Sequence, residues 1–546
     1  MAETIIENIP EPVYKNGIWK GAKIDWSEGY FQFGERLLSQ FKNYPDFVGQ
    51  IDGATGEAET YKNMGERSIR CAIWLQKQGI IQGDVVGLCT KNYFDSCIPL
   101  VASFYLGTVI NLWRYMNVNE EMVIYYIETT KPKMLFIDED NAKTVLDTIS
   151  KKKYFLPVVI FGKRKSQLSF KDILETPNSD EVDKFECTKV QAEDPAVLLY
   201  TSGSTDFPKS VLHSYRSIAN MMNYYSDDGK PSIVLSFSSL CCVSGMRTFL
   251  RSIIFKATMI LSNYKRSEVE NACKLIEKYK VTRISMTVYA VNFMCITKEV
   301  WEYDLSSVEQ IAFGGGVIKS NSIEIISRLF PKAEIFIRYG GTEFGTLITG
   351  KIKSNKMNSS GKVMFNCEVK IVDLSTRKIV GPNEKGELLC RTPKLMTCYL
   401  NNPTATDEVI DSEGWYHTGD LGYYDNEGDF FIVDRITVLL KIRGCHYSPA
   451  VIESVIQEHP GVAEVAVVAQ ASSRNYDLPM AFVTKVPGVE LLTSDIHAIV
   501  VKKLPSVMRL QGGVCFLEKM PCTSTGKICI KSLRQMARDF AEKTNY

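Results

Sequence analysis

Residues 195–210 read PAVLLYTSGSTDFPKS, an apolar run that leads into a loop of serine, threonine and glycine. The apolar run predicts a buried strand, and the pattern from Ser214 onward predicts a helix. Small hydroxyl side chains and a glycine let backbone amides and hydroxyl groups converge on phosphate oxygens, and Lys209 adds a positive charge. The stretch therefore predicts a phosphate-binding loop. The alternative is an ordinary turn between a strand and a helix.

Apolar runs of strand length recur along the chain and alternate with helical patterns such as RSIRCAIWL (67–75). A first set precedes the loop: VVGLC (85–89), MLFID (134–138) and LPVVIF (156–161). A second set is PAVLLY (195–200), SIVLSF (232–237), ATMILS (257–262), RISMTV (283–288), QIAFG (310–314) and EIFIRY (334–339). Alternation of strand and helix is typical of parallel sheets. We therefore predict an α/β fold with two mostly parallel sheet lobes.

The pattern changes from about residue 355, where shorter strands and polar turns predict an antiparallel, barrel-like third lobe. FFIVD (430–434) is the last clear strand of this lobe. After Asp434 and Arg435 the chain has its own succession of helix and strand patterns, which predicts a small α+β unit. We therefore predict a large N-terminal domain over residues 1–435 and a small, mobile C-terminal domain over residues 436–546.

The composition indicates a globular protein that binds its ligands locally. Of 546 residues, 45% are hydrophobic, and the formal net charge is +1, so no overall field attracts nucleic acid. The fifteen cysteines have no CxxC spacing, which favours reduced thiols. We find no apolar run long enough to span a bilayer. We expect an intracellular protein, in the cytoplasm or in the peroxisome, although the last residues do not form a peroxisomal import tripeptide.

The segment GWYHTGDLGYYDNEGDFFIVDR (414–435) places Asp420 and Arg435 on either side of a predicted hairpin. A carboxylate at this position can accept hydrogen bonds from two ribose hydroxyls, and the forked donors of an arginine suit oxyanions. Taken alone, the segment is more typical of a surface hairpin with a turn that contains glycine.

Two further segments carry single residues suited to phosphate chemistry. In IRYGGTEFGT (337–346), Glu343 follows a strand and two glycines, where a carboxylate can hold Mg²⁺ on nucleotide phosphates. In CTSTGKICIKSLR (522–534), Lys527 lies in a loop of serine, threonine and glycine and can present an ammonium group to a reacting centre. Any single lysine, however, is more often simply solvated.

In this order and spacing, the four segments resemble the adenylate-forming superfamily of AMP-binding enzymes, within it the branch of insect luciferase-like and 4-coumarate-CoA-ligase-like acyl-CoA synthetases. The resemblance spans nearly the whole chain and includes YLNNPTATDEVIDSEGWYHTGD (399–420). It implies that a carboxylate attacks the α-phosphate of ATP to give an acyl-adenylate, and that a thiol, usually that of CoA, then displaces AMP. ATP, Mg²⁺ and CoA are the implied cofactors.

The resemblance also implies roles for individual residues. Those that would hold pyrophosphate are Thr201, Ser202, Gly203, Ser204, Thr205 and Lys209. Those that would line the adenine and acyl pockets or contact the nucleotide are Gly314, Gly315, Gly316, Tyr339, Gly340, Thr342, Asp420 and Arg435. Glu343 would hold magnesium, and Lys527 would bind the adenylate oxygens in the first step. Rotation of the small domain would then bring Lys441, Arg443 and Gly444 toward the acyl site.

The sequence departs from this family in its phosphate loop. Asp206 and Ser210 stand where most members have glycine, and aspartate adds a side chain and a negative charge beside polyphosphate. At about 6 Å and an effective dielectric constant near 20, a pair of like charges costs about 2 to 3 kcal/mol. Aspartate tolerates the left-handed backbone, so the turn itself can form.

Two more departures concern the acyl pocket. Cys241 and Cys242 stand where relatives commonly have aromatic or histidine residues, and no histidine occurs between residues 214 and 416. Luciferases of this branch use a histidine in this segment, so the change argues against light emission. In GGGVIK (314–319) the glycines are not followed by the Ala-Pro of many relatives, so the pocket wall differs in shape.

Three functions follow from these observations. The leading hypothesis is an ATP-dependent acyl-CoA synthetase, an acid-thiol ligase, for a medium- or long-chain fatty acid or a related hydrophobic acid. The second is a binding or regulatory protein that kept the fold and weakened its ATP chemistry. The third is a luciferase-type monooxygenase. The expected partners are a small carboxylic acid, ATP and CoA, without nucleic acid or a transmembrane segment.

Overall fold

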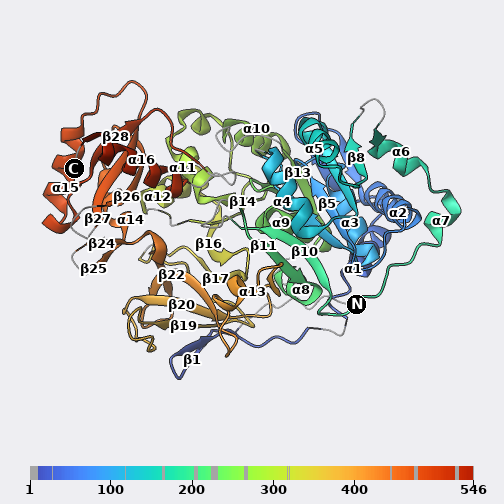
Figure 1. The fold of residues 1–546 in the computed structure, drawn as a ribbon, viewed down its shortest axis with the longest axis horizontal. Helices are drawn as coiled ribbons and strands as arrows, with labels where there is room; N and C mark the ends of the chain where they lie inside the picture. The colour runs from blue at the N-terminus through green and yellow to red at the C-terminus, as the bar shows by residue number, and fades with distance from the viewer. Residues whose placement is uncertain are drawn as a thin grey trace.

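The computed structural model contains three sheet lobes and a smaller C-terminal unit at one end of an elongated molecule (Figure 1). It describes residues 10–26, 29–116, 118–162, 167–201, 207–222, 232–262, 269–316, 318, 320–353, 355–442, 445–471, 477–522 and 528–544. The predicted α/β fold with mostly parallel sheets in two lobes is confirmed.

The first sheet has eight strands, with β5 and its parallel neighbours β6 and β7 at its centre. The strands in spatial order are β21 (Cys398–Tyr399), β11 (Ser210–Ser214), β10 (Pro195–Tyr200), β6 (Val109–Leu112), β5 (Val85–Cys89), β7 (Met134–Asp138), β8 (Val158–Phe161) and β9 (Leu168–Ser169). The apolar helix α3 (Cys97–Leu106) and the long helix α2 (Tyr61–Lys77) pack together beside this sheet, and both contribute to one large buried cluster.

The structure corrects one sequence expectation and confirms another. Strand β10 belongs to the first sheet, because it pairs in parallel with β6, and not to the second set of strands as predicted. Residues 210–214 form β11, which pairs antiparallel with β10 before α8 (Tyr215–Met222) begins. The helix predicted from about Ser214 is confirmed, because α8 begins at Tyr215, whereas the strand β11 that precedes it was not predicted. The sequence of β11, SVLHS, has only two adjacent apolar residues and did not identify it as a strand.

The second sheet has nine strands and is mostly parallel. In spatial order they are β18 (Lys362–Val363), β17 (Gly345–Lys351), β16 (Glu334–Gly341), β15 (Gln310–Gly314), β14 (Arg283–Thr287), β12 (Ser232–Ser236), β13 (Ala257–Leu261), β3 (Val48–Asp52) and β4 (Ala58–Thr60). Helix α9 (Val243–Ile254) packs on β12 and β13 and also against α1 (Phe33–Asn43) and α8, so it lies between the first two lobes (Figure 1).

The third lobe is an antiparallel sheet of six strands. Its order is β1 (Val13–Lys15), β2 (Ile18–Lys20), β19 (Glu368–Val372), β20 (Gly386–Arg391), β22 (Tyr416–Tyr424) and β23 (Phe430–Arg435). The predicted hairpin is present, because β22 and β23 pair with Asp420 opposite Arg435. The first two strands come from the N-terminus, which the sequence pattern did not predict.

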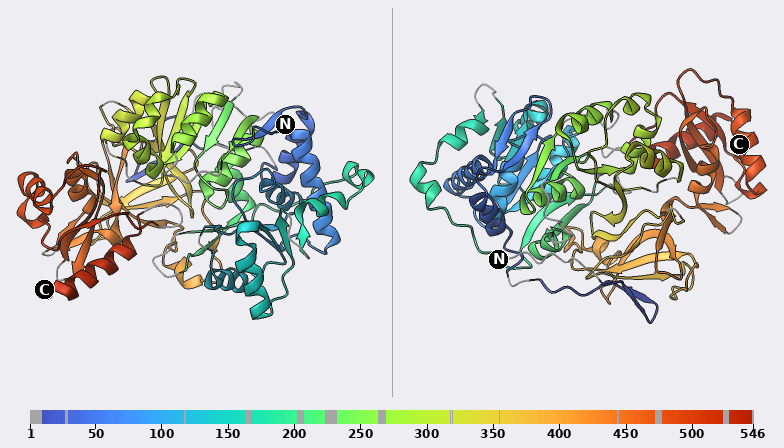
Figure 2. Two further views of the ribbon diagram at one scale, coloured as in Figure 1. Left: turned by 90° about the horizontal axis from the view of Figure 1, so that it is seen from above. Right: turned by 180° about the vertical axis from the view of Figure 1, so that it is seen from behind.

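The C-terminal unit follows β23 and has its own sheet and core. Its three-stranded sheet is β26 (Val462–Ala471), β27 (Asp477–Lys485) and β28 (Gly513–Leu517), and its helices are α14 (Pro449–Ile456), α15 (Thr493–Lys503) and α16 (Ile530–Thr544). The short hairpin of β24 (Leu440–Ile442) and β25 (Cys445–Tyr447) precedes this sheet. The unit lies beside α11 (Val288–Ile296) and α12 (Ser320–Leu329) in all three views (Figures 1 and 2). At this contact the Cys522 thiol forms a hydrogen bond with Tyr289 of α11.

Two general features complete the description. None of the helices in the described residues combines the length and the apolar character needed to cross a bilayer. Every cysteine whose side chain the structure describes carries a free thiol.

Candidate functional site

The candidate site is built where the carboxyl ends of β15 and β16 meet the hairpin of β22 and β23. Tyr339 of β16 donates a hydrogen bond from its hydroxyl to Asp420 Oδ2 at 2.6 Å. On the other side of the same carboxylate, Arg435 Nε lies 2.8 Å from Oδ1. Arg435 also donates to the carbonyl of Thr418 at 2.9 Å, which fixes its direction. The structure thus brings together three of the predicted residues, from two different sheets.

The electrostatics of this cluster follow from burial and the shared carboxylate. Burial raises the pKa of Tyr339 well above its usual value, and the charge of Asp420 raises it further. Burial lowers the pKa of Arg435, but the charges of Asp420 and Glu343 outweigh this effect and raise the pKa overall. Asp420, only 6% exposed, therefore accepts from Tyr339 with one oxygen and pairs with Arg435 through the other.

Glu343 lies in the loop between β16 and β17 and forms a second cluster. Its Oε1 accepts a hydrogen bond from the hydroxyl of Tyr399 at 2.9 Å, and its backbone carbonyl accepts one from Met396 at 2.6 Å. The Nζ atom of Lys209 lies 4.6 Å from the centre of the Tyr399 ring. Tyr399 therefore links Glu343 to the end of the predicted phosphate loop.

The base of the predicted phosphate loop is described, and its tip is not. The backbone N–H of Thr201 donates to the carbonyl of Lys209 at 3.1 Å, which closes the hairpin. Ser210 is buried, and its hydroxyl lies 3.3 Å from that of Tyr125. A glycine at this position would remove that contact. The predicted ligands Ser202, Gly203, Ser204 and Thr205 lie outside the described residues, as does Asp206.

The glycines at the edge of the site differ in how strictly the structure requires glycine at each position. A Cβ atom on Gly314 would lie 2.3 Å from the carbonyl oxygen of Arg338, and one on Gly340 would lie 2.1 Å from that of Gly345. Both positions therefore require glycine for strand packing. Gly315 has a φ of +83°, which a side chain rarely tolerates, whereas Gly316 has ordinary contacts at 3.5 Å or more.

Of the predicted site residues, the structure describes those of the C-terminal unit least completely. Lys441 is exposed on β24, where its backbone N–H donates to Asp477 at 2.7 Å. Arg443, Gly444 and Lys527 lie outside the described residues. Their predicted approach to the acyl site stays a prediction.

The sequence patterns gave no indication of His213 of β11, which is fully buried next to the site. Its Nε2 lies 2.8 Å from the carbonyl oxygen of Thr342, and its Nδ1 lies 2.8 Å from the hydroxyl of Ser217. Burial lowers the pKa of His213 to about 4. The imidazole is therefore neutral at pH 7, with its proton on Nε2, and holds the backbone of Thr342 beside Glu343. A single histidine in a short strand gave no signal of this role.

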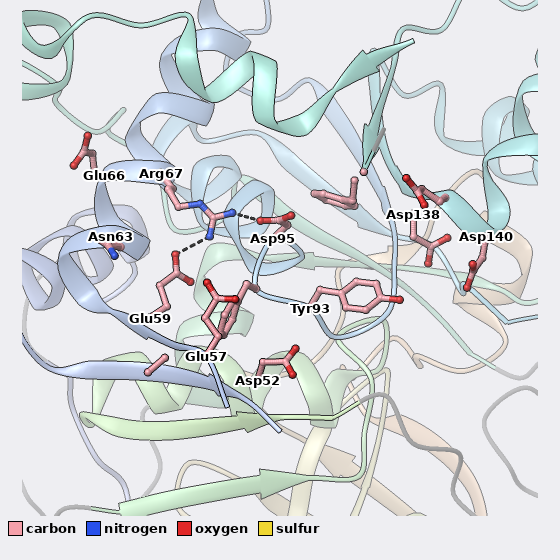
Figure 3. Close-up of a pocket in the computed structure, with 15 residues that line it drawn as sticks. Asp52, Glu57, Glu59, Asn63, Glu66, Arg67, Tyr93, Asp95, Asp138 and Asp140 are labelled. Carbon is pink, nitrogen blue, oxygen red and sulfur yellow. Dashed lines mark hydrogen bonds and ion pairs between the residues drawn. The ribbon is translucent and has the colours of Figure 1, made fainter. Parts of the chain in front are cut away.

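A cavity of about 820 Å³ lies away from this site and has the wrong charge for a nucleotide. It lies at the carboxyl ends of β5, β7 and β8, and its lining contains eight carboxylates and one arginine. Figure 3 shows that arginine, Arg67, between Glu59 and Asp95, with which it forms ion pairs. This acidic cavity contains none of the predicted site residues and repels polyphosphate.

The donor set around Glu343 is compatible with Mg²⁺ bound together with a nucleotide. The described residues contain no group of three or more aspartate, glutamate, histidine or cysteine side chains arranged for a metal ion. A single carboxylate is nevertheless typical of Mg²⁺ sites in which water and substrate phosphates complete the coordination. Glu343 uses one described side-chain bond and keeps further lone pairs for a cation.

Comparison with known proteins adds two family matches and several relatives. The model of the AMP-binding enzyme family matches residues 37–400, and the model of the AMP-binding enzyme C-terminal domain matches residues 451–527. The chain is 29% identical to a luciferin 4-monooxygenase of Photuris pensylvanica, over 92% of this chain and 95% of that protein. It is also 29% identical to the 4-coumarate–CoA ligase CCL1 of Humulus lupulus, over 91% and 92%.

Solved structures of similar proteins agree with these family matches. The luciferase-like enzyme from the nonluminescent mealworm Zophobas morio is 30% identical, with a TM-score of 0.70, over 77% of this chain and 99% of that chain. The anthranilate CoA ligase AuaEII in complex with anthranoyl-AMP has a TM-score of 0.85 at 21% identity, over 93% and 98%. The second likeness supports the fold alone.

Proposed function

The chain belongs to the AMP-binding enzyme family, and from that premise we propose that it is an ATP-dependent acid-thiol ligase. In the proposed reaction a carboxylate attacks the α-phosphorus of ATP, pyrophosphate leaves, and the thiol of CoA then displaces AMP from the acyl-adenylate. The observation that carries this proposal is the meeting of two clusters, Tyr339–Asp420–Arg435 and Glu343–Tyr399–Lys209. The charges of Asp420 and Glu343 both act on Arg435, so the two clusters share one electrostatic environment.

The predicted site residues have separate roles in this proposal. Asp420 accepts from the ribose hydroxyls in place of its present contact with Tyr339, whose ring then stacks on adenine. Thr342 contacts the α-phosphate, and His213 fixes the backbone of that residue. Lys209 supplies positive charge near the leaving pyrophosphate, and Lys527 approaches the reacting centre from the C-terminal unit. Catalysis then consists mainly of positioning and charge stabilisation.

Glu343 is the residue that would hold Mg²⁺, and the ion, when bound, neutralises negative charge on the nucleotide phosphates. The protein holds the carboxylate in place through Tyr399 and through the backbone bond to Met396. The chain therefore provides an oriented oxygen ligand rather than a complete metal site.

We propose that the acid has a hydrocarbon body, as in a fatty acid of medium length or a related hydrophobic acid. Support comes from the relatives, which include a 4-coumarate–CoA ligase, and from apolar residues between α9 and the second sheet, among them Val234, Ile284 and Ala312. Peroxisome and cytoplasm both remain compatible with this activity.

A second candidate function rests on Asp206. Its charge in the phosphate loop favours a family member that binds ligands but adenylates slowly. A luciferase-type monooxygenase is the third candidate, because a luciferin 4-monooxygenase is among the relatives of the chain. We rank it last, because Cys241 and Cys242 occupy the segment in which luciferases use histidine.

Exchange of labelled pyrophosphate into ATP, measured on the full chain with a panel of carboxylic acids, tests the proposal. Exchange that depends on an acid supports the ligase, and subsequent formation of the CoA thioester completes the demonstration. Absence of exchange with every acid, together with retained ATP binding, would favour the binding protein. Light output with luciferin, ATP and O₂ tests the third candidate.

A further inference from the structure

Lys394 is a buried lysine between β20 and β21, next to the turn that carries Glu343. Its side chain is only 2% exposed, and its Nζ atom donates a hydrogen bond to the carbonyl of Thr346 at 2.9 Å. The same Nζ atom lies 3.5 Å from Sγ of Cys367 and 3.8 Å from Sδ of Met364. In the described part of the chain, no aspartate or glutamate side chain pairs with Lys394.

The burial of this ammonium group costs stability. A charged group loses its hydration when it is buried, and a single bond to a neutral carbonyl does not offset that loss. Burial accordingly lowers the pKa of Lys394, an effect that the thiol of Cys367 opposes only in part. A methionine is about as long and would fill the same space without this cost. Lysine at this position therefore points to a role other than stability.

The side chain of Lys394 lies along the turn between β16 and β17. These strands pair antiparallel with Gly341 opposite Gly345, so residues 342–344 form the tip of a tight turn. A Cβ atom on Gly345, which has a φ of +64°, would lie 3.4 Å from Cβ of Lys394. The stem of the lysine therefore packs against the turn, and its ammonium group ends on Thr346 at the base of the turn.

Three hydrogen bonds to backbone carbonyls hold this turn from outside: His213 Nε2 to Thr342, Met396 N–H to Glu343 and Lys394 Nζ to Thr346. Two of the three come from one short segment, residues 394–396. The hydroxyl of Ser217 donates to the carbonyl of Lys394 at 2.7 Å and so fixes this segment on α8. The orientation of the Glu343 carboxylate therefore depends on how this segment lies against the turn.

We propose that Lys394 is a positioning residue, whose ammonium group fixes the turn and so holds the Glu343 carboxylate in one orientation for Mg²⁺. The lysine acts through the backbone, because its donor contacts Thr346 and not the carboxylate. A ligand that is already ordered binds a cation without first losing conformational freedom. This inference rests on the proposed function, because it takes Glu343 as the residue that would hold the metal.

The variant Lys394→Met, made in the full chain, tests the inference, because it keeps the side-chain length and removes the donor and the charge. In the pyrophosphate exchange assay we expect the Mg²⁺ concentration for half-maximal exchange to rise at least fivefold, with a smaller change in the KM for the acid. Lys394→Arg, which keeps a cationic donor, should show less than half of this rise. Lys385→Met, an exposed lysine just before β20, should titrate like the wild type.

Thermal unfolding separates this role from a structural one. The midpoint for Lys394→Met should equal or exceed that of the wild type, because a buried ammonium group without an ion pair is removed. An unchanged Mg²⁺ titration in Lys394→Met would overturn the inference, whatever the midpoint. A lower midpoint would also contradict it, because the lysine would then serve stability.

The double variant with Glu343→Gln shows whether the lysine acts through the carboxylate. If it does, the double variant needs the same Mg²⁺ concentration as Glu343→Gln within twofold, because the group that Lys394 positions is already lost. Effects of the two substitutions that multiply would overturn the inference, since they mean that the two residues act independently.

Amide hydrogen exchange of the chain without metal or nucleotide tests the inference separately from the proposed function. The amides of residues 342–346 should exchange at least fivefold faster in Lys394→Met than in the wild type or in Lys385→Met, whereas those of residues 310–314 in β15 should be unchanged. If no acid supports pyrophosphate exchange, the ligase proposal fails, and the amide measurement still decides whether Lys394 holds the turn. Faster exchange there supports the inference, and equal exchange overturns it.

Discussion

The Nε atom of Arg435 lies 2.8 Å from Oδ1 of Asp420, and the two residues face each other across β22 and β23. This contact lies at the last strand before the C-terminal unit. The residue proposed to hold the ribose is therefore tied directly to the segment where the predicted domain boundary falls. Occupation of the nucleotide site and the position of the C-terminal unit can influence each other through this pair.

Asp420→Asn should weaken ATP binding. Asparagine keeps the size of the side chain but loses the charge, and a hydrogen bond to a charged group contributes about 1.5 to 3 kcal/mol. We expect the KM for ATP in the exchange assay to rise about ten- to a hundredfold. Glu413→Gln, an exposed carboxylate of the same lobe, is the control. An unchanged KM in Asp420→Asn would contradict the proposed ribose contact.

Glu343→Gln should alter the dependence on magnesium. The amide removes the anionic oxygen ligand but can still meet the Tyr399 hydroxyl. We expect the Mg²⁺ concentration that gives half-maximal exchange to rise at least tenfold. Glu309→Gln, exposed just before β15, should titrate like the wild type. If Glu343→Gln and the wild type have the same Mg²⁺ titration, the metal is held elsewhere.

His213 should make the stability of the protein sensitive to mild acid. Its pKa is lowered by burial from 6.5 to about 4, so the unfolded chain binds more protons between these values. The contribution of His213 to the free energy of unfolding is fully present above pH 6.5 and is lost as the pH falls toward 4. From pH 7 to pH 5, linkage predicts a loss of about 2 kcal/mol from this one group.

Urea unfolding of the wild type and of His213→Asn at pH 7 and pH 5 measures this effect. The variant should be less stable at pH 7, because it loses the bond to the Thr342 carbonyl, but its stability should fall less between the two pH values. His497→Asn, on α15, should show the full wild-type loss. An equal loss in His213→Asn and the wild type would assign the acid sensitivity to other groups.

The strands that the sequence predicted best are buried on both faces. Residues 85–89, 134–138 and 310–314 form strands with the predicted bounds, because continuous apolar runs are typical of parallel strands covered by helices. The sheet to which a strand belongs is decided by long-range pairing. For this reason β10 was assigned to the wrong lobe, and the pairing of β1 and β2 with β19 was not foreseen.

The residues of the candidate site likewise fall into two groups, those that the sequence identified and those that it did not. Asp420, Arg435 and Glu343 were found because they lie in segments with recognisable order and spacing. His213 and Lys394 lie in ordinary strand and loop patterns, where any one charged residue is more often solvated. Only the folded structure brings Arg247 of α9 against the hydroxyl of Thr346 and Lys394 against the carbonyl of the same residue.

Asp206→Gly should raise the adenylation rate. Removing a negative charge near polyphosphate, at about 6 Å and an effective dielectric constant near 20, relieves about 2 to 3 kcal/mol of repulsion. Glycine also restores the freedom of the loop backbone. We expect at least a tenfold gain in exchange at limiting ATP. Ser210→Gly should give less, because Ser210 is buried and in contact with Tyr125. A slower Asp206→Gly would mean that the loop is adapted to its acid.

The two half-reactions should respond separately to Lys441 and Lys527, two lysines that follow Arg435 in the chain. Lys527 is proposed to act in adenylation. Lys441 follows Arg435 closely in the sequence and is exposed on β24. A rotation of the C-terminal unit about the segment at Arg435 would therefore carry Lys441 toward the acyl site. Lys527→Ala should therefore slow pyrophosphate exchange at least a hundredfold, while transfer from a supplied acyl-adenylate to CoA is slowed less. Lys441→Ala should show the opposite pattern, and Lys502→Ala, exposed on α15, should affect neither. Equal slowing of both half-reactions in each variant would contradict alternation, because a fixed unit would present both lysines to the same step.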